Sequence, residues 1–216
     1  MTQLKDNNSV VVLFENYFQN IKEYISTINY DRILDLLNLL VKSHRNNRIF
    51  IMGNGGSIST AAHFSNDLTS ISPGFMTICL NDVNSMSCIA NDRGYELVFY
   101  EQLISLASAD DVVIMLSASG SSENLLKAVE ASKYKLAKTV AIVGFDGGLL
   151  KDKVDVCIHI ESSLGDYRAV EDCHSIICHF IVDFIDKLSK NRAVVKAGFK
   201  RGVNPFEDIE RLILFK

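Results

Sequence analysis

The stretch that decides the fold is RIFIMGNGGS, residues 48–57. Its first half, Arg48–Met52, is a short apolar run rich in isoleucine, which is typical of a strand buried on both faces of a sheet. Its second half, Gly53–Ser57, carries three glycines and opens a segment long enough for a helix, Ser57–Leu68. Glycines let the backbone approach a ligand closely, and free N–H groups at a helix N-terminus favour anions. The stretch therefore predicts an α/β domain whose first strand is followed by either an anion-binding loop or a purely structural turn.

Outward from this stretch, four more short apolar runs follow, separated by segments of helical length. Strands buried on both faces and joined by helix-length connections imply a parallel sheet with helices on both sides. We therefore predict a three-layer α-β-α sandwich around a five-stranded parallel sheet. The further strands are expected at Met76–Leu80, Asp111–Leu116, Thr139–Phe145 and Val154–Ile160, and the further helices at Tyr95–Leu106, Ser122–Tyr134 and Tyr167 to about Ser189.

The two ends of the chain differ from this central part, which we place at residues 47–189. Apolar residues recur at three- and four-residue spacing in segments 10–21 and 33–41, so residues 1–46 are expected to form helices. We expect them to pack on the domain and on other subunits. The tail, residues 190–216, is basic and glycine-bearing before a helical pattern returns. It suits either a docking arm that completes an oligomer or a loosely attached end.

Composition excludes several classes of protein. The 216 residues include 22 Lys and Arg against 26 Asp and Glu, giving a formal net charge of −4. No basic excess is available to neutralise a phosphate backbone, so we expect no nucleic-acid partner. The apolar runs are far shorter than the roughly 20 residues that span a bilayer, so no membrane segment is expected. The polar N-terminus has no signal-peptide core, and the five cysteines form no CxxC pair, which fits buried thiols in a cytoplasmic protein.

A second polar loop follows the third predicted strand. Ser117–Ser122 reads SASGSS and leads into a predicted helix. Its four hydroxyls and its backbone amides can cradle an oxyanion or a phosphate without a lysine, although a capped flexible loop would look the same. Ligands of open parallel sheets bind outside the carboxyl ends of the strands. Two such loops at one sheet edge therefore favour a phosphorylated ligand.

Imidazoles and carboxylates recur at helical spacing on two predicted helices. His63 and Asp67 are four residues apart and share a helix face, and Glu171 and His179 are eight apart on the last helix. If the two helices meet, these groups could bind a divalent metal such as zinc or act as an acid/base pair. Each pair taken alone could also be an ordinary surface contact.

Four motifs together resemble one family. GNGGSxxxAxHFxxDL at 53–68, NDRGYE at 91–96, SASGSS at 117–122 and EDCHxxxxH at 171–179 are similar to the sugar isomerase (SIS) family with its flavodoxin-like fold, and within it to the phosphoheptose isomerases. The resemblance covers about residues 30–189. It implies an aldose–ketose isomerase that converts sedoheptulose 7-phosphate to D-glycero-D-manno-heptose 7-phosphate, for heptose-containing glycoconjugates of the lipopolysaccharide or capsule type. It further implies a homotetramer with sites near the subunit contacts.

The resemblance also assigns roles to residues. It implies zinc, one ion per subunit, on His63, Asp67, Glu171 and His179, and proton transfer by Asp67 and His179. It implies substrate contacts by Asn54, Gly55, Gly56, Ser57, Asn91, Asp92, Ser117, Ala118, Ser119, Ser122 and Glu171.

Three positions depart from the family's usual residues. Asp67 stands where the family usually has Glu, Glu171 where it has Gln, and Ala118 where it has Thr. A shorter carboxylate at 67 and an added charge at 171 bear on substrate detail more than on the type of reaction. The alternatives are an isomerase of another sugar phosphate and a non-catalytic SIS protein that binds a phosphosugar or a protein partner. Retention of an acid at 67 and of His179 argues against the second alternative.

Overall fold

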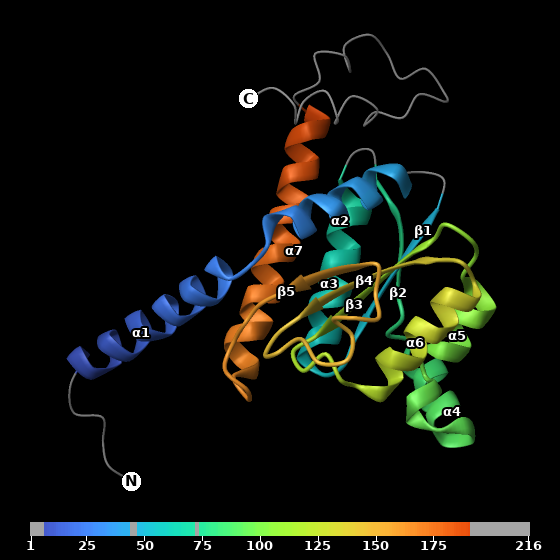
Figure 1. Ribbon diagram of the computed structural model, residues 1–216, viewed down its shortest axis with the longest axis horizontal. Coiled ribbons are helices and arrows are strands. Elements are labelled where there is room, and N and C mark those ends of the chain that lie inside the picture. Colours follow the sequence, from blue (N-terminus) through green and yellow to red (C-terminus); the bar gives the residue numbers. More distant parts are fainter. Residues whose placement is uncertain (1–6, 44–46, 72–73, 191–216) are drawn as a thin grey trace.

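The computed structural model describes residues 7–43, 47–71 and 74–190 (Figure 1). Five strands alternate with helices along most of this length. The strands are β1 (Arg48–Gly53), β2 (Met76–Cys79), β3 (Val112–Ser117), β4 (Lys138–Val143) and β5 (Val156–His159). The helices are α1 (Asn7–Ser26), α2 (Tyr30–Ser43), α3 (Gly56–Ser70), α4 (Val83–Arg93), the 3-10 turn η1 (Tyr95–Leu97), α5 (Tyr100–Leu106), α6 (Glu123–Tyr134) and α7 (Tyr167–Lys190).

All five strands run parallel, in the order β2-β1-β3-β4-β5. β1 pairs with both β2 and β3, so the sheet grows in one direction after β1 and in the other direction after β2. The connections that leave β1 and β3 therefore diverge to opposite faces of the sheet. Such a switch point is where open parallel sheets bind ligands.

Successive side chains of each strand point to opposite faces of the sheet. Ile49 and Ile51 of β1 pack in a core with α2, α3 and α7, whereas Phe50 and Met52 pack in a second core with α5 and α6. Figure 1 shows these helix layers on either side of the sheet, and every residue of β3 between them is buried. Burial on both faces explains why the strands read as unbroken apolar runs, and it confirms the predicted three-layer sandwich.

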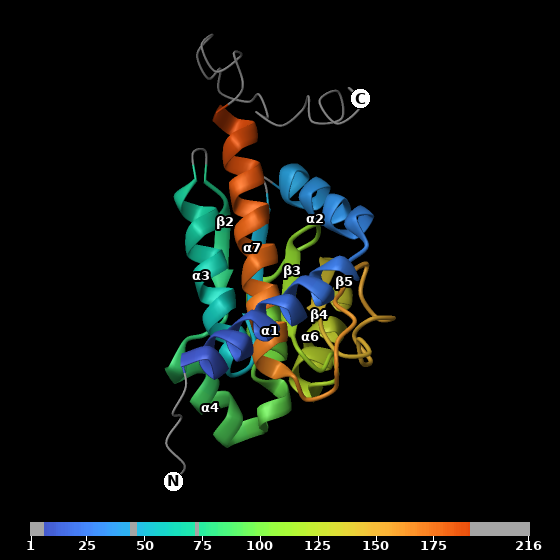
Figure 2. The same ribbon diagram turned by 90° about the vertical axis from the view of Figure 1, so that its left-hand side faces the viewer.

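Helix α1 extends away from the rest of the molecule, and only its C-terminal part meets α7 (Figures 1 and 2). Polar contacts attach that part to the start of α7: the hydroxyl of Tyr17 donates to Asp172 at 2.6 Å, and the hydroxyl of Tyr24 donates to Asp166 at 3.0 Å. Further toward the N-terminus the helix is apolar but uncovered. Val10, Phe14 and Phe18 each expose more than half of their surface.

The expected elements are present, with three differences in detail. Helix α4 was not predicted, because no residue of it is buried and it carries no apolar stripe. The segment expected as one helix, Tyr95–Leu106, is divided into η1 and α5. β4 ends at Val143, before the predicted Phe145, which turns the chain with a φ of +51°. The predicted tail, 190–216, lies almost entirely outside the described residues, which end at 190.

His174 of α7 makes the stability of this fold depend on pH. Its side chain is fully buried, and neither ring nitrogen has a hydrogen-bond partner among the residues that the structure describes. Burial lowers the pKa of His174 to about 4, against an ordinary value near 6.5, because the interior disfavours the charged imidazolium. The unfolded chain thus binds more protons than the folded one between these two pH values.

Stability should therefore fall as the pH drops through about 6.5 toward 4, by on the order of 2 kcal/mol at pH 5 from this residue alone. We expect His174→Leu, which cannot titrate, to flatten this dependence. Denaturant unfolding of the metal-free protein and the variant between pH 5 and 7.5 measures it. Parallel pH curves for the two proteins would contradict the assignment.

Candidate active site

The loops after β1 and β3 lie next to each other at the switch point. Gly53, the last residue of β1, is paired with Leu116 of β3. A side chain at Gly53 could not be accommodated, because its Cβ would stand 2.9 Å from the Leu116 carbonyl oxygen and from Ser57. The glycine loop, residues 53–57, and the serine loop, residues 117–122, therefore both open on the same edge of the sheet.

A pair of asparagine side chains joins the two loops. Asn54 Nδ2 donates to Asn124 Oδ1 at 3.0 Å, and Asn124 Nδ2 donates back to Asn54 Oδ1 at 2.9 Å. Asn54 Oδ1 also accepts a hydrogen bond from the hydroxyl of Tyr95 at 2.9 Å. With these bonds made, the second N–H of Asn54 remains for a ligand. Neither Asn124 nor Tyr95 was predicted as a site residue, although Tyr95 lies within the motif NDRGYE and Asn124 comes two residues after SASGSS.

Within the serine loop, hydroxyl groups fix the path of the backbone. Ser117 Oγ accepts from the N–H of Gly120 at 3.0 Å, and Ser119 Oγ accepts from the N–H of Ser121 at 3.3 Å. Ser122 precedes α6, but its hydroxyl makes no capping hydrogen bond. That hydroxyl, together with the N-terminal end of α6, is available to an anion.

The segment after β4 packs against the serine loop and bonds to it. Gly120 has a φ of +61°, and a Cβ at this position would collide with the carbonyl of Gly147. The N–H of Leu150 donates to the Gly120 carbonyl at 2.8 Å. The close approach of these two segments requires glycine and leaves the serine loop little freedom to move.

The two loops enclose a small polar pocket of about 90 Å³. A wider hollow of about 440 Å³ adjoins it across Asn54 and Ser122 and reaches Tyr95 and Glu96. Among the described residues, no lysine or arginine lines the small pocket. Its lining consists of Asn54, Ser57, Leu116, Ser117, Ala118, Ser119, Ser122, Tyr167 and Glu171.

Glu171 brings the one charged side chain into this pocket. Its carboxylate lies against the backbone of Gly56, the first residue of α3, where a Cβ would stand 2.7 Å from the carboxyl carbon. The side chain is half-buried, and its carboxylate has no hydrogen bond or ion pair to any described residue. The pocket therefore contains a carboxylate without a partner.

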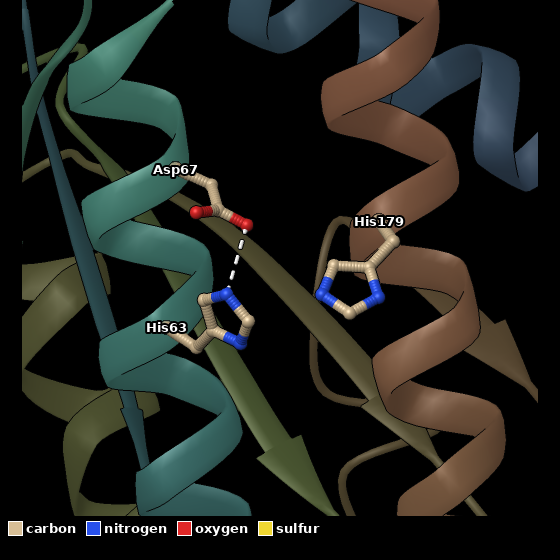
Figure 3. A group of neighbouring side chains, drawn as sticks. All are labelled: His63, Asp67 and His179. Atoms are coloured by element: carbon tan, nitrogen blue, oxygen red, sulfur yellow. Dashed lines mark ion pairs between the residues drawn. The ribbon is translucent and has the colours of Figure 1, made fainter.

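A second polar group lies between α3 and α7. His63 and Asp67 project from α3 toward His179 of α7 (Figure 3). His63 Nε2 is 3.3 Å from Asp67 Oδ2, and the imidazole centroids of the two histidines are 5.0 Å apart. One donor atom from each residue lies within 4.8 Å of the other two. Two imidazoles and a carboxylate in this arrangement suit a divalent metal such as zinc.

Cys178 lies beside this group but does not resemble a ligand. It is buried, and burial, with a smaller effect of the Asp67 charge, raises the pKa of its thiol far above the ordinary value. Its sulfur is not among the donor atoms that converge in this group.

Three predicted site residues lie apart from the metal group, and two of them also lie outside the pocket. Glu171 was expected among the metal ligands, but its carboxylate lies in the pocket and does not join the group of His63, Asp67 and His179. Asn91 and Asp92 lie exposed on α4, where Asn91 Nδ2 donates to Asp92 Oδ1 at 2.7 Å, and they line neither hollow. Their contact with a substrate stays a prediction.

Comparison with known proteins agrees with this arrangement. The sequence profile of the SIS domain matches residues 14–144, more than half of the chain. The phosphoheptose isomerase of Vibrio parahaemolyticus is 38% identical over 144 residues, 65% of this chain and 75% of the relative. That of Helicobacter pylori is 38% identical over 157 residues, 70% and 81% of the two chains. The solved structure of a phosphoheptose isomerase from Francisella tularensis has a TM-score of 0.75 at 27% identity and covers 87% of this chain and all of its own.

The chain therefore belongs to the SIS domain family. The five-stranded parallel sheet with helices on both faces is consistent with the fold of this family. Among the described residues, no helix is long and apolar enough to cross a membrane.

The metal group predicts a testable stoichiometry. Protein stripped with a chelator and reloaded should take up close to one zinc ion per chain, because three donor atoms already converge. The double variant His63→Ala, His179→Ala should lose this uptake, whereas His159→Ala, outside the group, should keep it. Elemental analysis after gel filtration measures the bound metal. Equal zinc content in the double variant and the parent would remove these residues from the metal site.

Proposed function

We propose that this protein is a phosphoheptose isomerase, which interconverts sedoheptulose 7-phosphate and D-glycero-D-manno-heptose 7-phosphate. The single observation that carries the proposal is an oxyanion pocket, with no lysine among the described residues that line it, which shares α3 and α7 with a histidine–carboxylate group, in a chain whose relatives bear that name. We further propose that the product serves heptose-containing glycoconjugates of the lipopolysaccharide or capsule type.

The phosphate group belongs in the serine loop. Ser119 and Ser122 offer hydroxyls there, Gly55 and Gly56 offer backbone without side chains, and the start of α6 favours negative charge. Because the phosphate is remote from the reacting carbons, its binding energy can position the carbonyl end of the sugar. Ser57, Ser117, Ala118 and Asn54 complete the proposed substrate contacts.

Aldose–ketose isomerisation moves a proton between C1 and C2 through an enediol and needs a base, an acid and polarisation of the carbonyl. His63, Asp67 and His179 fit zinc by their donor chemistry, with Glu171 as a further proposed ligand. A bound zinc ion would polarise the carbonyl as a Lewis acid. We assign proton transfer to Asp67 and His179, which face the space between α3 and α7 from opposite sides.

We propose a homotetramer in the cytoplasm. The uncovered apolar residues of α1, among them Val10, Phe14 and Phe18, support an oligomer, because exposed apolar patches commonly mark protein interfaces. All five cysteines are free thiols, which suits a reducing compartment. The formal net charge of −4 at pH 7 supports a small-molecule substrate and argues against a nucleic-acid partner.

Turnover by purified, zinc-defined protein tests the proposal. The protein should isomerise sedoheptulose 7-phosphate. Ribose 5-phosphate and fructose 6-phosphate, which are substrates of other sugar-phosphate isomerases, are the controls. Preference for one of these controls would assign the chain to another sugar-phosphate isomerase. Binding without turnover of any of the three would indicate a non-catalytic SIS protein.

The serine loop should contribute to affinity. Ser119→Ala and Ser122→Ala should each weaken phosphosugar binding by roughly 1–3 kcal/mol, the range for a hydrogen bond to a charged group. Fold stability should change little, since both residues lie at the sheet edge. Calorimetric titration measures the affinity, and Ser163→Ala, whose side chain lies outside the pocket lining, is the control. Parental affinity in both loop variants would exclude a phosphate site there.

Tyr95 should act through Asn54. Tyr95→Phe removes only the hydroxyl that donates to Asn54 Oδ1, so the amide is less well oriented toward the substrate. We expect KM to rise about fivefold with kcat nearly unchanged, because one neutral hydrogen bond is worth about 1 kcal/mol. Tyr134→Phe, an exposed tyrosine at the end of α6, should leave both constants unaltered. An unchanged KM in Tyr95→Phe would show that the Tyr95 hydroxyl does not contribute to substrate binding.

A further inference from the structure

Helices α3 and α7 run side by side in the same direction, and a series of contacts connects the pocket to the metal group. Glu171 lies against Gly56 at the start of the series. One turn further, the hydroxyls of Thr60 and Ser175 are 3.4 Å apart. Beyond them the rings of His63 and His179 meet (Figure 3). The proposed phosphate pocket and the metal group thus lie at two ends of one line of contacts between these helices.

The two ends are closer than the sequence spacing suggests. Seven residues separate Gly56 from His63, a rise of about 10 Å along the helix axis. Side chains of a helix tilt toward its N-terminus, so His63 and His179 both lean back toward the pocket. Glu171 lies on α7 at the pocket end of this series, eight residues before His179, and its two methylene groups allow the carboxylate to rotate along α7 toward the metal group.

The position of the Glu171 carboxylate conflicts with the proposed use of the pocket. The backbone ends of α3 and α6 and the serine hydroxyls make the pocket suited to an anion, and Glu171 supplies an anion with no partner of its own. A phosphate monoester entering the pocket would meet a like charge at short range, and such repulsion is strong where water is partly excluded. Phosphate and carboxylate therefore compete for the same space.

We propose that Glu171 couples the two ends: with no cation bound its carboxylate occupies the phosphate pocket, and a cation held by His63, Asp67 and His179 draws it out. Cation and phosphate then bind cooperatively, and each raises the affinity for the other by the same factor. This rests on the proposed function for the identity of the pocket, and it deepens that function by assigning how the site is regulated.

The probe is inorganic phosphate, titrated by calorimetry into chelator-treated protein and into protein loaded with one equivalent of zinc. In the parent protein, zinc should raise phosphate affinity about tenfold or more. Glu171→Gln should bind phosphate about tenfold more tightly than the parent without zinc, and zinc should then add less than about threefold. Asp172→Asn is the matched control, because it removes the same charge from the next residue, which is exposed and faces Tyr17 of α1. The asparagine oxygen can still accept the Tyr17 hydrogen bond, so this variant should behave as the parent.

Two results would overturn the coupling. One is equal phosphate affinity of the parent and Glu171→Gln without zinc, which would mean that the carboxylate does not occupy the pocket. The other is an equal gain from zinc in both proteins, which would mean that the cation attracts phosphate directly. Glu171→Ala should repeat the result of Glu171→Gln, and thermal unfolding of each variant verifies that it is folded. Since these titrations need no turnover, a failure here with intact isomerase activity would refute the coupling alone, and the reverse would refute the proposed function alone.

Discussion

The parallel pairing of β1 with β3 is the constraint on which the site depends. It brings the glycine loop and the serine loop to one edge of the sheet, although about 60 residues separate them in the chain. The same pairing sends α3 to one face and α6 to the other, so the N-terminal ends of both helices open on the space between the loops. Gly53 makes this possible, because any side chain there would separate the strands' ends. The two hydrogen bonds between Asn54 and Asn124 then hold the glycine loop against the start of α6, which follows the serine loop.

Local signals in the sequence were enough for most of the fold. Strands buried on both faces appear as apolar runs, and α2, α6 and α7 each carry an apolar stripe, because one face of each packs on the sheet or on a neighbouring helix. Helix α4 escaped prediction because it buries nothing. It depends instead on its ends: Asp82 Oδ1 accepts from the N–H of Ser85 at 2.8 Å, and Gly94, with a φ of +107°, stops the helix. Such capping signals are short and easily overlooked beside a hydrophobic pattern.

The candidate site was predictable to the extent that its residues are neighbours in the chain. His63 and Asp67 share a helix turn and were found from their spacing, and the serine loop was found from its composition. That His179 faces them follows only from the packing of α7 beside α3. The contact of Glu171 with Gly56 and the bond from Tyr95 to Asn54 are equally invisible in the sequence, since each depends on the angle between two elements. The spacing on the last helix indicated Glu171 and the resemblance to a family gave it a role, but neither gave the place of its carboxylate.

The proposed preference of the pocket for anions depends on the backbone more than on side chains. No lysine or arginine of the described part of the chain lines it, and main-chain N–H groups at the starts of α3 and α6 would favour an anion there. Main-chain groups do not titrate in the physiological range, and a point mutation at one position leaves them in place. Side-chain differences around the pocket, as at positions 118 and 171, would therefore adjust the strength of binding without removing these groups. The proposed capacity to hold an oxyanion follows from the topology itself.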